Sequence, residues 1–466
     1  MQAEATTGRG RWAAEFRTLL ALAIPVVLSE LGWMAMAIVD TIMVGRLSPT
    51  AIGAVGLSSA IYYAPSLFGV GILLGLDTLV SQAFGREDYD DCHRSLAQGV
   101  YLAAAFTPLL MAVIWAAPFA LSRWGVNPAV EVQADAYLRI LNWGTLPLLL
   151  YAAFRRYLQG IAQVRPVTFA LISANLVNWA GNWALIYGKL GLPAMGVRGS
   201  ALSTCVARVY MAAVLIFVAW RYERSRGHRL FAHWAGPNLQ RLRQLIRLGL
   251  PTACQIALEV GAFGFATVIA GRLRPEALAA HQIALNCASV TYMVPLGISA
   301  AAAVSVGHAV GARQPARARR VGWMAIATGV VFMALAALAF LIVPIPILHV
   351  YTRDSGVLGF GVPLLALAGA FQIFDGIQTA ATGALRGLGE TRTPMMVNLV
   401  GYWLFGLPLG AYLCFRTTLG IYGVWVGLTL ALIFIALLVL RKWGRESRRI
   451  LNDSVVPRPT AAKAAT

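Results

Sequence analysis

Long apolar stretches, separated by short polar connections, run through nearly the whole chain. A helix needs about 20 mostly apolar residues to cross the hydrocarbon core of a bilayer. Twelve stretches meet this requirement, at residues 18–44, 53–83, 95–119, 133–158, 167–188, 197–220, 246–271, 279–305, 321–347, 359–385, 395–415 and 421–441. The pattern therefore predicts an all-α polytopic membrane protein with twelve transmembrane helices.

The composition agrees with this prediction, because 59% of the 466 residues are hydrophobic and only 12% are charged, against about 25% charged residues in a typical soluble domain. The formal net charge of +19 could indicate a nucleic-acid partner. No basic stripe with interleaved aromatic residues remains, however, once the apolar stretches are assigned to lipid. We therefore expect the lipid bilayer and no nucleic acid as a partner, and no obligate protein partner is evident.

The basic residues also predict the orientation of the chain. Most Lys and Arg residues lie in the two termini and the even-numbered connections, and few lie in the odd-numbered connections. Cytoplasmic loops carry the excess of basic residues in multi-pass proteins. Both termini are therefore predicted to be cytoplasmic.

An internal repeat appears at a fixed offset of 226 residues. It pairs Pro25 with Pro251, GRLSP at 45–49 with GRLRP at 271–275, Gly71 with Gly297, and Gly85 with Gly311. Transporters commonly duplicate a half in this way. Each half has six spans, so we expect two six-helix lobes related by a pseudo-two-fold axis along the membrane normal. The predicted parts are an N-lobe (1–220), a cytoplasmic linker (221–245), a C-lobe (246–441) and a disordered cytoplasmic tail (442–466).

Five acidic residues lie inside the predicted spans and more than two residues from either end: Glu30, Asp40, Asp77, Glu259 and Asp375. A charged side chain at mid-bilayer costs about 2.5 to 3.5 kcal/mol, so each acid needs a partner, water or a function. Only Arg139 and Arg208 are expected to act as counter-charges within the spans. We therefore expect most of these acids to be protonated, to bind a cation or to face water.

Asp40 lies near the outer end of the first span, and Asn178 and Asn182 lie four residues apart on the fifth, on one helical face. A carboxylate with two amide carbonyls suits a hard cation such as Na+ or a shuttled proton. The alternative for the two asparagines is hydrogen bonding between helices. No other metal site is predicted, because the His and Cys residues show no ligand spacing.

Glu259 and Asp375 lie at the middle of the seventh and tenth spans. An apolar surrounding disfavours the charged form of a carboxylate, which favours proton exchange. The alternative is that both acids are only hydrogen-bonded within the helix bundle. Gln282, Asn286 and Tyr292 on the eighth span are candidates for further ligands or for the lining of a substrate cavity, although ordinary helix packing explains each of them too.

Asp77 and the acids of the following loop are expected to have structural roles. Asp77 lies close to a cytoplasmic end, where we expect it to cap its helix or to pair with Arg86. The acidic cluster of Glu87, Asp88, Asp90 and Asp91 is expected to form a solvated turn. No role is assigned to Glu30.

Four segments resemble the multidrug and toxic compound extrusion (MATE) family. They are AIVDTIMVGRLSPTAIGAVGLS from Ala37, GLDTLVSQAFG from Gly75, EALAAHQIALN from Glu276 and GALRGLGETRTP from Gly383. Within this family the chain is similar to the NorM-type branch. Glu259 and Asp375 match the embedded acids of that branch, Asp40 matches the aspartate of the first helix, and Asn178 and Asn182 match its asparagine pair.

The resemblance implies a V-shaped pair of lobes that alternates access across a bacterial inner membrane and exports cationic, lipophilic compounds in exchange for H+ or Na+. The sequence contains no GxxxxGK[ST] segment, so an ion gradient is the expected energy source. We expect neither a cofactor nor an enzymatic reaction, because no nucleophile with a base and no metal cluster is evident. The alternative is a lipid or lipid-linked precursor flippase, but the acids favour cationic cargo.

Overall fold

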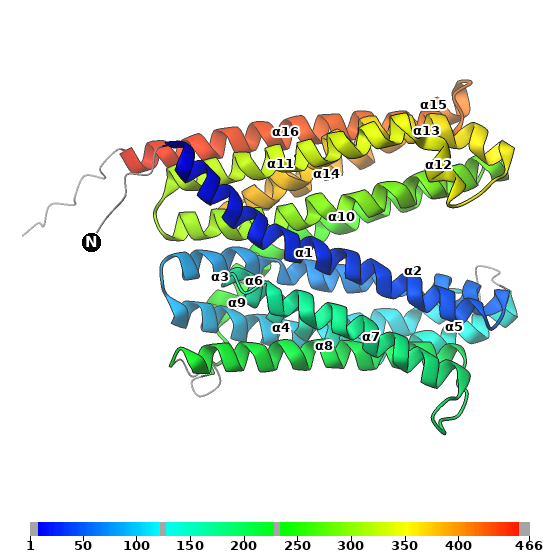
Figure 1. Ribbon diagram of the computed structural model, residues 1–466, viewed down its shortest axis with the longest axis horizontal. Coiled ribbons are helices and arrows are strands. Elements are labelled where there is room, and N and C mark those ends of the chain that lie inside the picture. Colours follow the sequence, from blue (N-terminus) through cyan, green and yellow to red (C-terminus); the bar gives the residue numbers. More distant parts are fainter. Residues whose placement is uncertain (1–7, 122–126, 228–233, 456–466) are drawn as a thin grey trace, which may run out of the picture. The chain divides into compact units, whose positions relative to one another are not determined.

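The computed structural model describes residues 8–121, 127–227 and 234–455, which are almost entirely helical (Figure 1). Within these residues, ten helices are long and apolar enough to cross a membrane. The two other predicted spans, 133–158 and 167–188, are helical as well. The predicted fold class, an all-α polytopic membrane protein, is therefore confirmed.

The described residues of the first half of the chain form nine helical segments. They are α1 (Gly8–Gly45), α2 (Pro49–Leu73), α3 (Gly75–Gly85), α4 (Tyr89–Leu121), α5 (Pro128–Leu141), the 3-10 turn η2 (Asn142–Gly144), α6 (Thr145–Gly160), α7 (Arg165–Tyr187) and α8 (Val197–Ser225). Local chemistry fixes where several of them begin. Ser48 caps α2 by accepting a hydrogen bond from the Ala51 amide at 3.1 Å, and Pro49 occupies the first position, where no amide hydrogen is needed.

The second half continues the same pattern. Its segments are α9 (Leu239–Ala270), α10 (Pro275–Gly311), α11 (Pro315–Ile342), α12 (Pro344–His349), α13 (Ser355–Leu388), α14 (Arg392–Asn398), the π-helical η3 (Leu399–Gly406), α15 (Leu407–Arg416) and α16 (Ile421–Val455). Asp354 caps α13 by accepting a hydrogen bond from the Val357 amide at 2.9 Å. The eleventh predicted span is formed by α14, η3 and α15 together.

The chain divides into two compact units. Unit 1 comprises residues 1–21, 81–87 and 264–466, and unit 2 comprises residues 22–80 and 88–263. The predicted lobe boundaries and the pseudo-two-fold axis stay predictions. The predicted tail differs from the structure at its start, because α16 continues as a helix to Val455. The rest of that tail, residues 456–466, lies outside the described residues.

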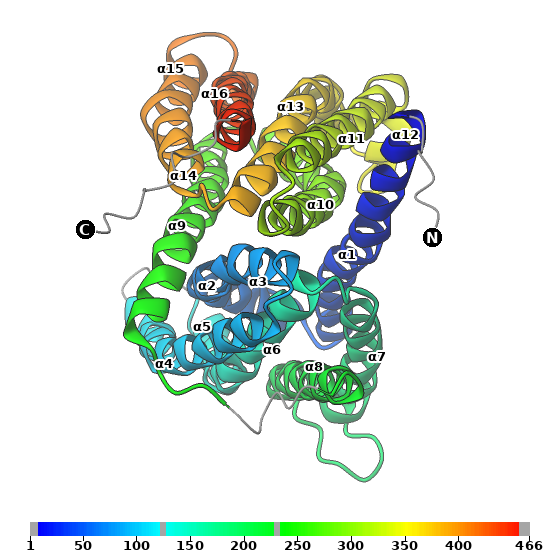
Figure 2. The same cartoon turned by 90° about the vertical axis from the view of Figure 1, so that its left-hand side faces the viewer.

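Each unit is a bundle of closely packed helices (Figure 2). In unit 1, α13 packs against α10, α11 and α16. In unit 2, α8 packs against α5, α6 and α7, while α2 packs against α5 and α4 against α6. Small residues permit this close packing: a Cβ atom on Gly383 would lie only 2.2 Å from the backbone oxygen of Ser299.

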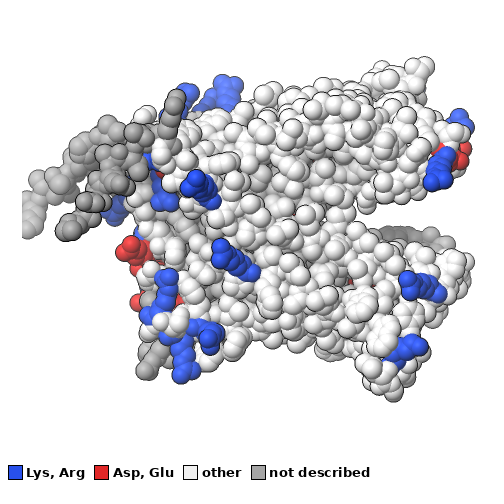
Figure 3. Space-filling model, viewed as in Figure 1, with Lys and Arg blue, Asp and Glu red and all other residues white. Residues whose placement is uncertain are grey.

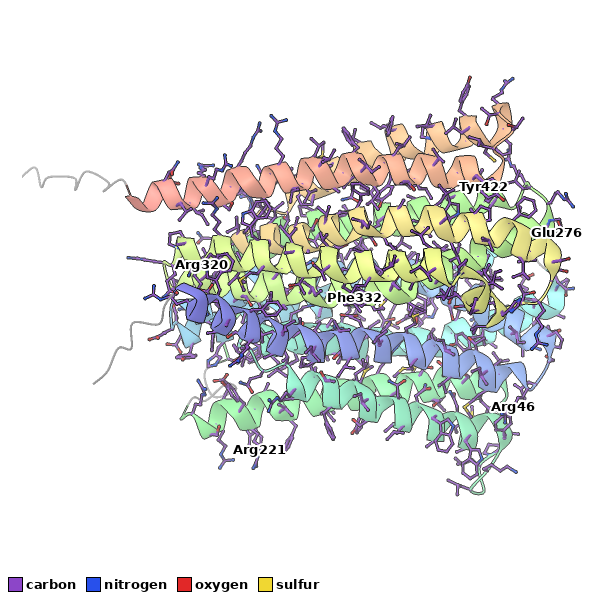
Figure 4. All side chains as sticks on the ribbon, turned by 45° about the horizontal axis from the view of Figure 1, so that its top comes forward. Arg46, Arg221, Glu276, Arg320, Phe332 and Tyr422 are labelled. Carbon is purple, nitrogen blue, oxygen red and sulfur yellow. The ribbon has the colours of Figure 1, made fainter. Side chains whose placement is uncertain are left out.

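Charged residues concentrate toward the ends of the helices on the face drawn in Figure 3. In unit 1, Glu276 and Tyr422 lie at one end and Arg320 at the other, with Phe332 between them (Figure 4). In unit 2, Arg46 and Arg221 lie at opposite ends (Figure 4). Within each unit, the connections predicted to be extracellular and cytoplasmic therefore lie at opposite ends.

Candidate functional site

The predicted residues Asp40, Asn178 and Asn182 come together in unit 2, where Thr204 joins them; we call these four residues the Asp40 cluster. Asn182 Nδ2 donates a hydrogen bond to Asp40 Oδ1 at 2.6 Å and lies 3.1 Å from Asn178 Oδ1. Thr204 Oγ1 donates to Asp40 Oδ2 at 3.2 Å, and Asn178 Nδ2 lies 3.4 Å from Thr204 Oγ1. The two carboxylate oxygens therefore each accept a hydrogen bond from a different helix.

Three helices position the Asp40 cluster inside the bundle. Asp40 comes from α1, the asparagines from α7 and Thr204 from α8. All four side chains are buried, and Asp40 is 6% exposed. Gly181 lets α7 and α8 approach, since a Cβ atom there would lie 2.4 Å from Ser203 Oγ. Ser203 Oγ in turn donates to the Asn178 backbone oxygen at 2.8 Å.

The Asp40 cluster combines one carboxylate with oxygens of amide and hydroxyl groups, which are hard ligands for a proton or a small cation. Within the described residues, Asn182 Oδ1 is buried and has no hydrogen-bond partner. It is therefore an open acceptor beside Asp40. No group of three or more His, Cys, Asp or Glu side chains suited to a metal ion occurs in the part of the chain that the structure describes.

A buried cation lies beside the Asp40 cluster. Arg208, one turn beyond Thr204 on α8, is 4% exposed. Its Nη1 donates to the Tyr62 hydroxyl at 2.6 Å, and its guanidinium carbon lies 4.5 Å from the centroid of the Tyr62 ring. Arg208 was expected within a span, whereas Thr204 and Tyr62 gave no sequence signal, because hydroxyl side chains are common in membrane helices.

The prediction that Arg139 neutralises one of the five acids within the spans is wrong. Arg139 pairs with Asp135 at 2.7 Å on an exposed face of α5, so it does not neutralise any of the five acids. Arg155, which the sequence analysis overlooked, is buried on α6 and pairs with Glu30. Glu30 on α1 therefore has its ion-pair partner on α6, inside unit 2.

Asp77 has an ion-pair partner that the sequence did not indicate. It is 1% exposed, and Arg156 Nη1 lies 3.7 Å from its Oδ2 atom. The predicted solvated turn is wrong for Asp91, which is 3% exposed and pairs with Arg241. Basic side chains distant in sequence supply these partners, which a local pattern cannot reveal.

The two deep acids of the second half lie in different compact units. Asp375 on α13 belongs to unit 1, is 5% exposed and lies with its Oδ1 atom 3.4 Å from Thr379 Oγ1. Glu259 on α9 is half-buried and belongs to unit 2. Their roles stay predictions.

The candidate cavity residues on α10 are the least enclosed. Gln282 and Asn286 are exposed and four residues apart, and Tyr292 is half-buried. Asn286 Oδ1 accepts a hydrogen bond from the Tyr351 hydroxyl at 2.8 Å. Gln282 and Asn286 are therefore accessible from one face of α10.

Comparison with known proteins identifies the family. The family model named MatE matches residues 25–184 and 251–412. The protein is 36% identical to the "Probable multidrug resistance protein NorM" of Mesorhizobium japonicum, over 94% of this chain and 95% of that one. It is 33% identical to the protein of the same name from Brucella suis, over 94% of both chains.

Solved structures share the fold. A crystal structure of MATE in the bent conformation superposes with a TM-score of 0.85 at 18% identity, over 96% of this chain and 99% of that one. A eukaryotic MATE transporter gives a TM-score of 0.82 at 21% identity, over 95% of this chain and 99% of the other. The family model and the named relatives agree with the predicted class, a membrane transporter and not an enzyme. Because both a family model and close relatives cover most of its length, the protein belongs to the MatE family.

Proposed function

We propose that this protein is a secondary active antiporter that exports cationic, lipophilic compounds in exchange for H+ or Na+. The observation that carries the proposal is the Asp40 cluster, a buried carboxylate held by amide and hydroxyl groups inside a membrane bundle. The relatives from Mesorhizobium japonicum and Brucella suis are named as multidrug resistance proteins, which supports drug-like cargo.

Antiport needs a site whose occupancy changes the conformational equilibrium. A ligand shifts such an equilibrium only by its difference in affinity for the two states. In the proposed cycle, the coupling ion binds the Asp40 cluster and favours one opening of the transporter, and the organic cation favours the other. The ion gradient supplies the free energy, and no cofactor is needed.

The acids of the second half extend the proposal. We assign Glu259 and Asp375 a coupling role beside that of Asp40, because both are carboxylates within helices that are long and apolar enough to span the membrane. Gln282, Asn286 and Tyr292 are proposed to contact the substrate from α10. Their exposed or half-buried side chains support this assignment.

The proposed location is a bacterial inner membrane, with both termini in the cytoplasm. The excess of basic residues in the termini and even-numbered connections supports this orientation. Fusion of a reporter that is active only in the cytoplasm to either terminus tests it, and an inactive fusion at either end would contradict it.

The decisive experiment uses purified protein in liposomes loaded with ethidium. A Na+ gradient or a pH gradient is imposed, one at a time, and dye efflux is followed by fluorescence. Efflux under one gradient and not under the other identifies the coupling ion. Liposomes without protein are the control for leakage.

The same liposomes discriminate the flippase alternative. A headgroup-labelled fluorescent phospholipid, accessible to a membrane-impermeant quencher, reports lipid movement between leaflets. Antiport predicts gradient-driven dye efflux with no acceleration of lipid movement. Accelerated lipid movement without dye efflux would instead support the flippase.

A further inference from the structure

Arg208 is a buried cation that lacks a carboxylate partner within the described residues. It is 4% exposed, and no Asp or Glu oxygen there lies within ion-pair distance of its guanidinium group. The hydrogen-bond partner that it does have, the Tyr62 hydroxyl, is neutral. A buried charge without a carboxylate in ion-pair contact is costly inside a membrane bundle, so it needs compensation from a more distant acidic group.

Unit 2 holds this guanidinium group in a fixed place. Gly144 in η2 makes room for it, since a Cβ atom there would lie 3.1 Å from both Cδ and Nη1 of Arg208. The Tyr62 hydroxyl lies 3.1 Å from Thr145 Oγ1, which is 3.2 Å from Asn142 Oδ1. Tyr62, Asn142 and Thr145 are all buried, so a chain of hydrogen bonds anchors the tyrosine to which Arg208 donates.

The Asp40 cluster is the acidic group one helical turn from Arg208 on α8. Thr204 and Arg208 are four residues apart on α8, which places them on one face, about 5 to 6 Å between Cβ atoms. The Thr204 hydroxyl bonds Asp40 Oδ2 at 3.2 Å. Both side chains are buried, so their charges interact through a medium of low effective dielectric constant although they are not in ion-pair contact.

We propose that Arg208 is the fixed counter-charge of the Asp40 carboxylate and that it sets how tightly the Asp40 cluster holds the coupling ion. This inference rests on the proposed coupling role of Asp40. With the cluster empty, the carboxylate and the guanidinium compensate each other. When a cation arrives, it meets the positive field of Arg208, which weakens binding and promotes release.

Release matters because an antiporter must load and unload its coupling ion in every cycle. A buried carboxylate without a counter-charge would hold any cation strongly, since charges interact strongly in a medium of low effective dielectric constant. Arg208 is thus a positioning residue that acts through Asp40. It carries out no transport step itself.

The test measures ethidium efflux from proteoliposomes against the concentration of whichever ion drives the unaltered protein. Arg208→Met removes the charge and keeps most of the side-chain length. We expect the half-saturating ion concentration to fall on the order of tenfold, with a lower maximal rate because release slows. Arg208→Lys, which keeps the charge, should reverse most of that shift. An unchanged half-saturating concentration in Arg208→Met would overturn the proposal.

Tyr62→Phe is the matched control, because it removes the hydrogen bond to Arg208 and leaves the charge in place. Its half-saturating concentration should shift much less than that of Arg208→Met. An equal shift in both variants would show that the hydrogen bond to Tyr62, and not the charge of Arg208, determines ion affinity, and would overturn the proposal.

A second measurement does not depend on transport. Asp40→Asn, Arg208→Met and the double variant are compared by thermal unfolding in detergent. Asp40→Asn should lower the melting temperature by leaving Arg208 uncompensated, and the double variant should recover part of that loss. Strictly additive effects would overturn the inference. Gradient-driven efflux by Asp40→Asn would instead contradict the proposed function itself.

Discussion

The indole nitrogen of Trp425 on α16 donates a hydrogen bond to Nδ1 of His281 on α10 at 3.0 Å. An indole nitrogen can only donate, so Nδ1 of His281 carries no proton and the ring is protonated on Nε2. That atom lies 3.1 Å from Thr267 Oγ1. Both rings are at most 1% exposed. The pair therefore joins two helices of unit 1 through a fixed tautomer, which the spacing of the histidines in the sequence did not indicate.

Trp425→Phe should destabilise unit 1 by leaving His281 Nδ1 buried without a donor. The expected loss includes about 1 to 3 kcal/mol for the unsatisfied acceptor, in addition to the loss of packing. Thermal unfolding of the purified protein in detergent measures it.

Trp443→Phe on the same helix is the control for packing. Trp443 is fully buried, but its Nε1 atom has no hydrogen-bond partner within the described residues. Its replacement should therefore lower the melting temperature less than Trp425→Phe does. Equal losses would contradict the role of the hydrogen bond.

The Glu30 and Arg155 pair leads to a second prediction. Both side chains are largely buried in unit 2, so Glu30→Ala should cost about 3 to 5 kcal/mol by leaving the guanidinium group uncompensated. The double variant Glu30→Gln with Arg155→Met removes both charges and should be more stable than Glu30→Ala. Chemical unfolding followed by tryptophan fluorescence checks the order of stability, and the reverse order would refute the pairing.

Close contact between α10 and α13 leads to a third prediction. A Cβ atom on Gly383 would collide with the backbone of Ser299, which cannot move aside as a flexible side chain could. Gly383→Ala should therefore destabilise the protein by about 1 to 3 kcal/mol. Gly359→Ala on the same helix meets nothing within 4 Å and should be neutral or slightly stabilising. The melting temperatures of the two variants test this prediction. Equal melting temperatures would argue against the close contact between α10 and α13.

Glu390, in the connection between α13 and α14, predicts a pH dependence. Burial alone would raise its pKa, but the Thr393 amide, which donates to it at 3.0 Å, and Lys442, 3.6 Å away, together lower the pKa below the ordinary 4.5. A lowered pKa in the folded state stabilises the protein above the unfolded value, and this stability is lost as the pH falls through the folded value.

The expected result is that the unaltered protein is more stable than Glu390→Gln at pH 7 and that this advantage disappears below about pH 4.5. Melting temperatures of both proteins across this range measure it. An advantage that grows toward low pH would have the wrong sign and would contradict the assignment.

The fold was largely predictable because membrane insertion is decided by the average hydropathy of each helix, a local property of the sequence. The ion-pair partners of the buried acids were not predictable in this way. Arg155 and Arg156 lie at the end of the predicted span 133–158 and were not among the expected counter-charges, whereas they pair with Glu30 and Asp77 from distant segments. Hydropathy says nothing about such pairs, because tertiary contacts create them.

The sequence indicated only some of the residues of the Asp40 cluster. Helical spacing placed Asn178 and Asn182 on one face, and the family resemblance pointed to Asp40. Thr204 gave no signal, since a threonine in a membrane helix commonly bonds to its own backbone, as Thr204 does with the Ser200 oxygen at 3.0 Å.

The most direct test of the proposed mechanism is gradient-driven ethidium efflux by Asp40→Asn in proteoliposomes. Asp135→Asn, which alters an acid paired with Arg139 on α5 of the same unit, is the matched control. The account predicts that Asp40→Asn abolishes efflux driven by the coupling ion, while Asp135→Asn transports as the unaltered protein does. Undiminished efflux by Asp40→Asn under the same gradient would contradict the coupling role of the Asp40 cluster.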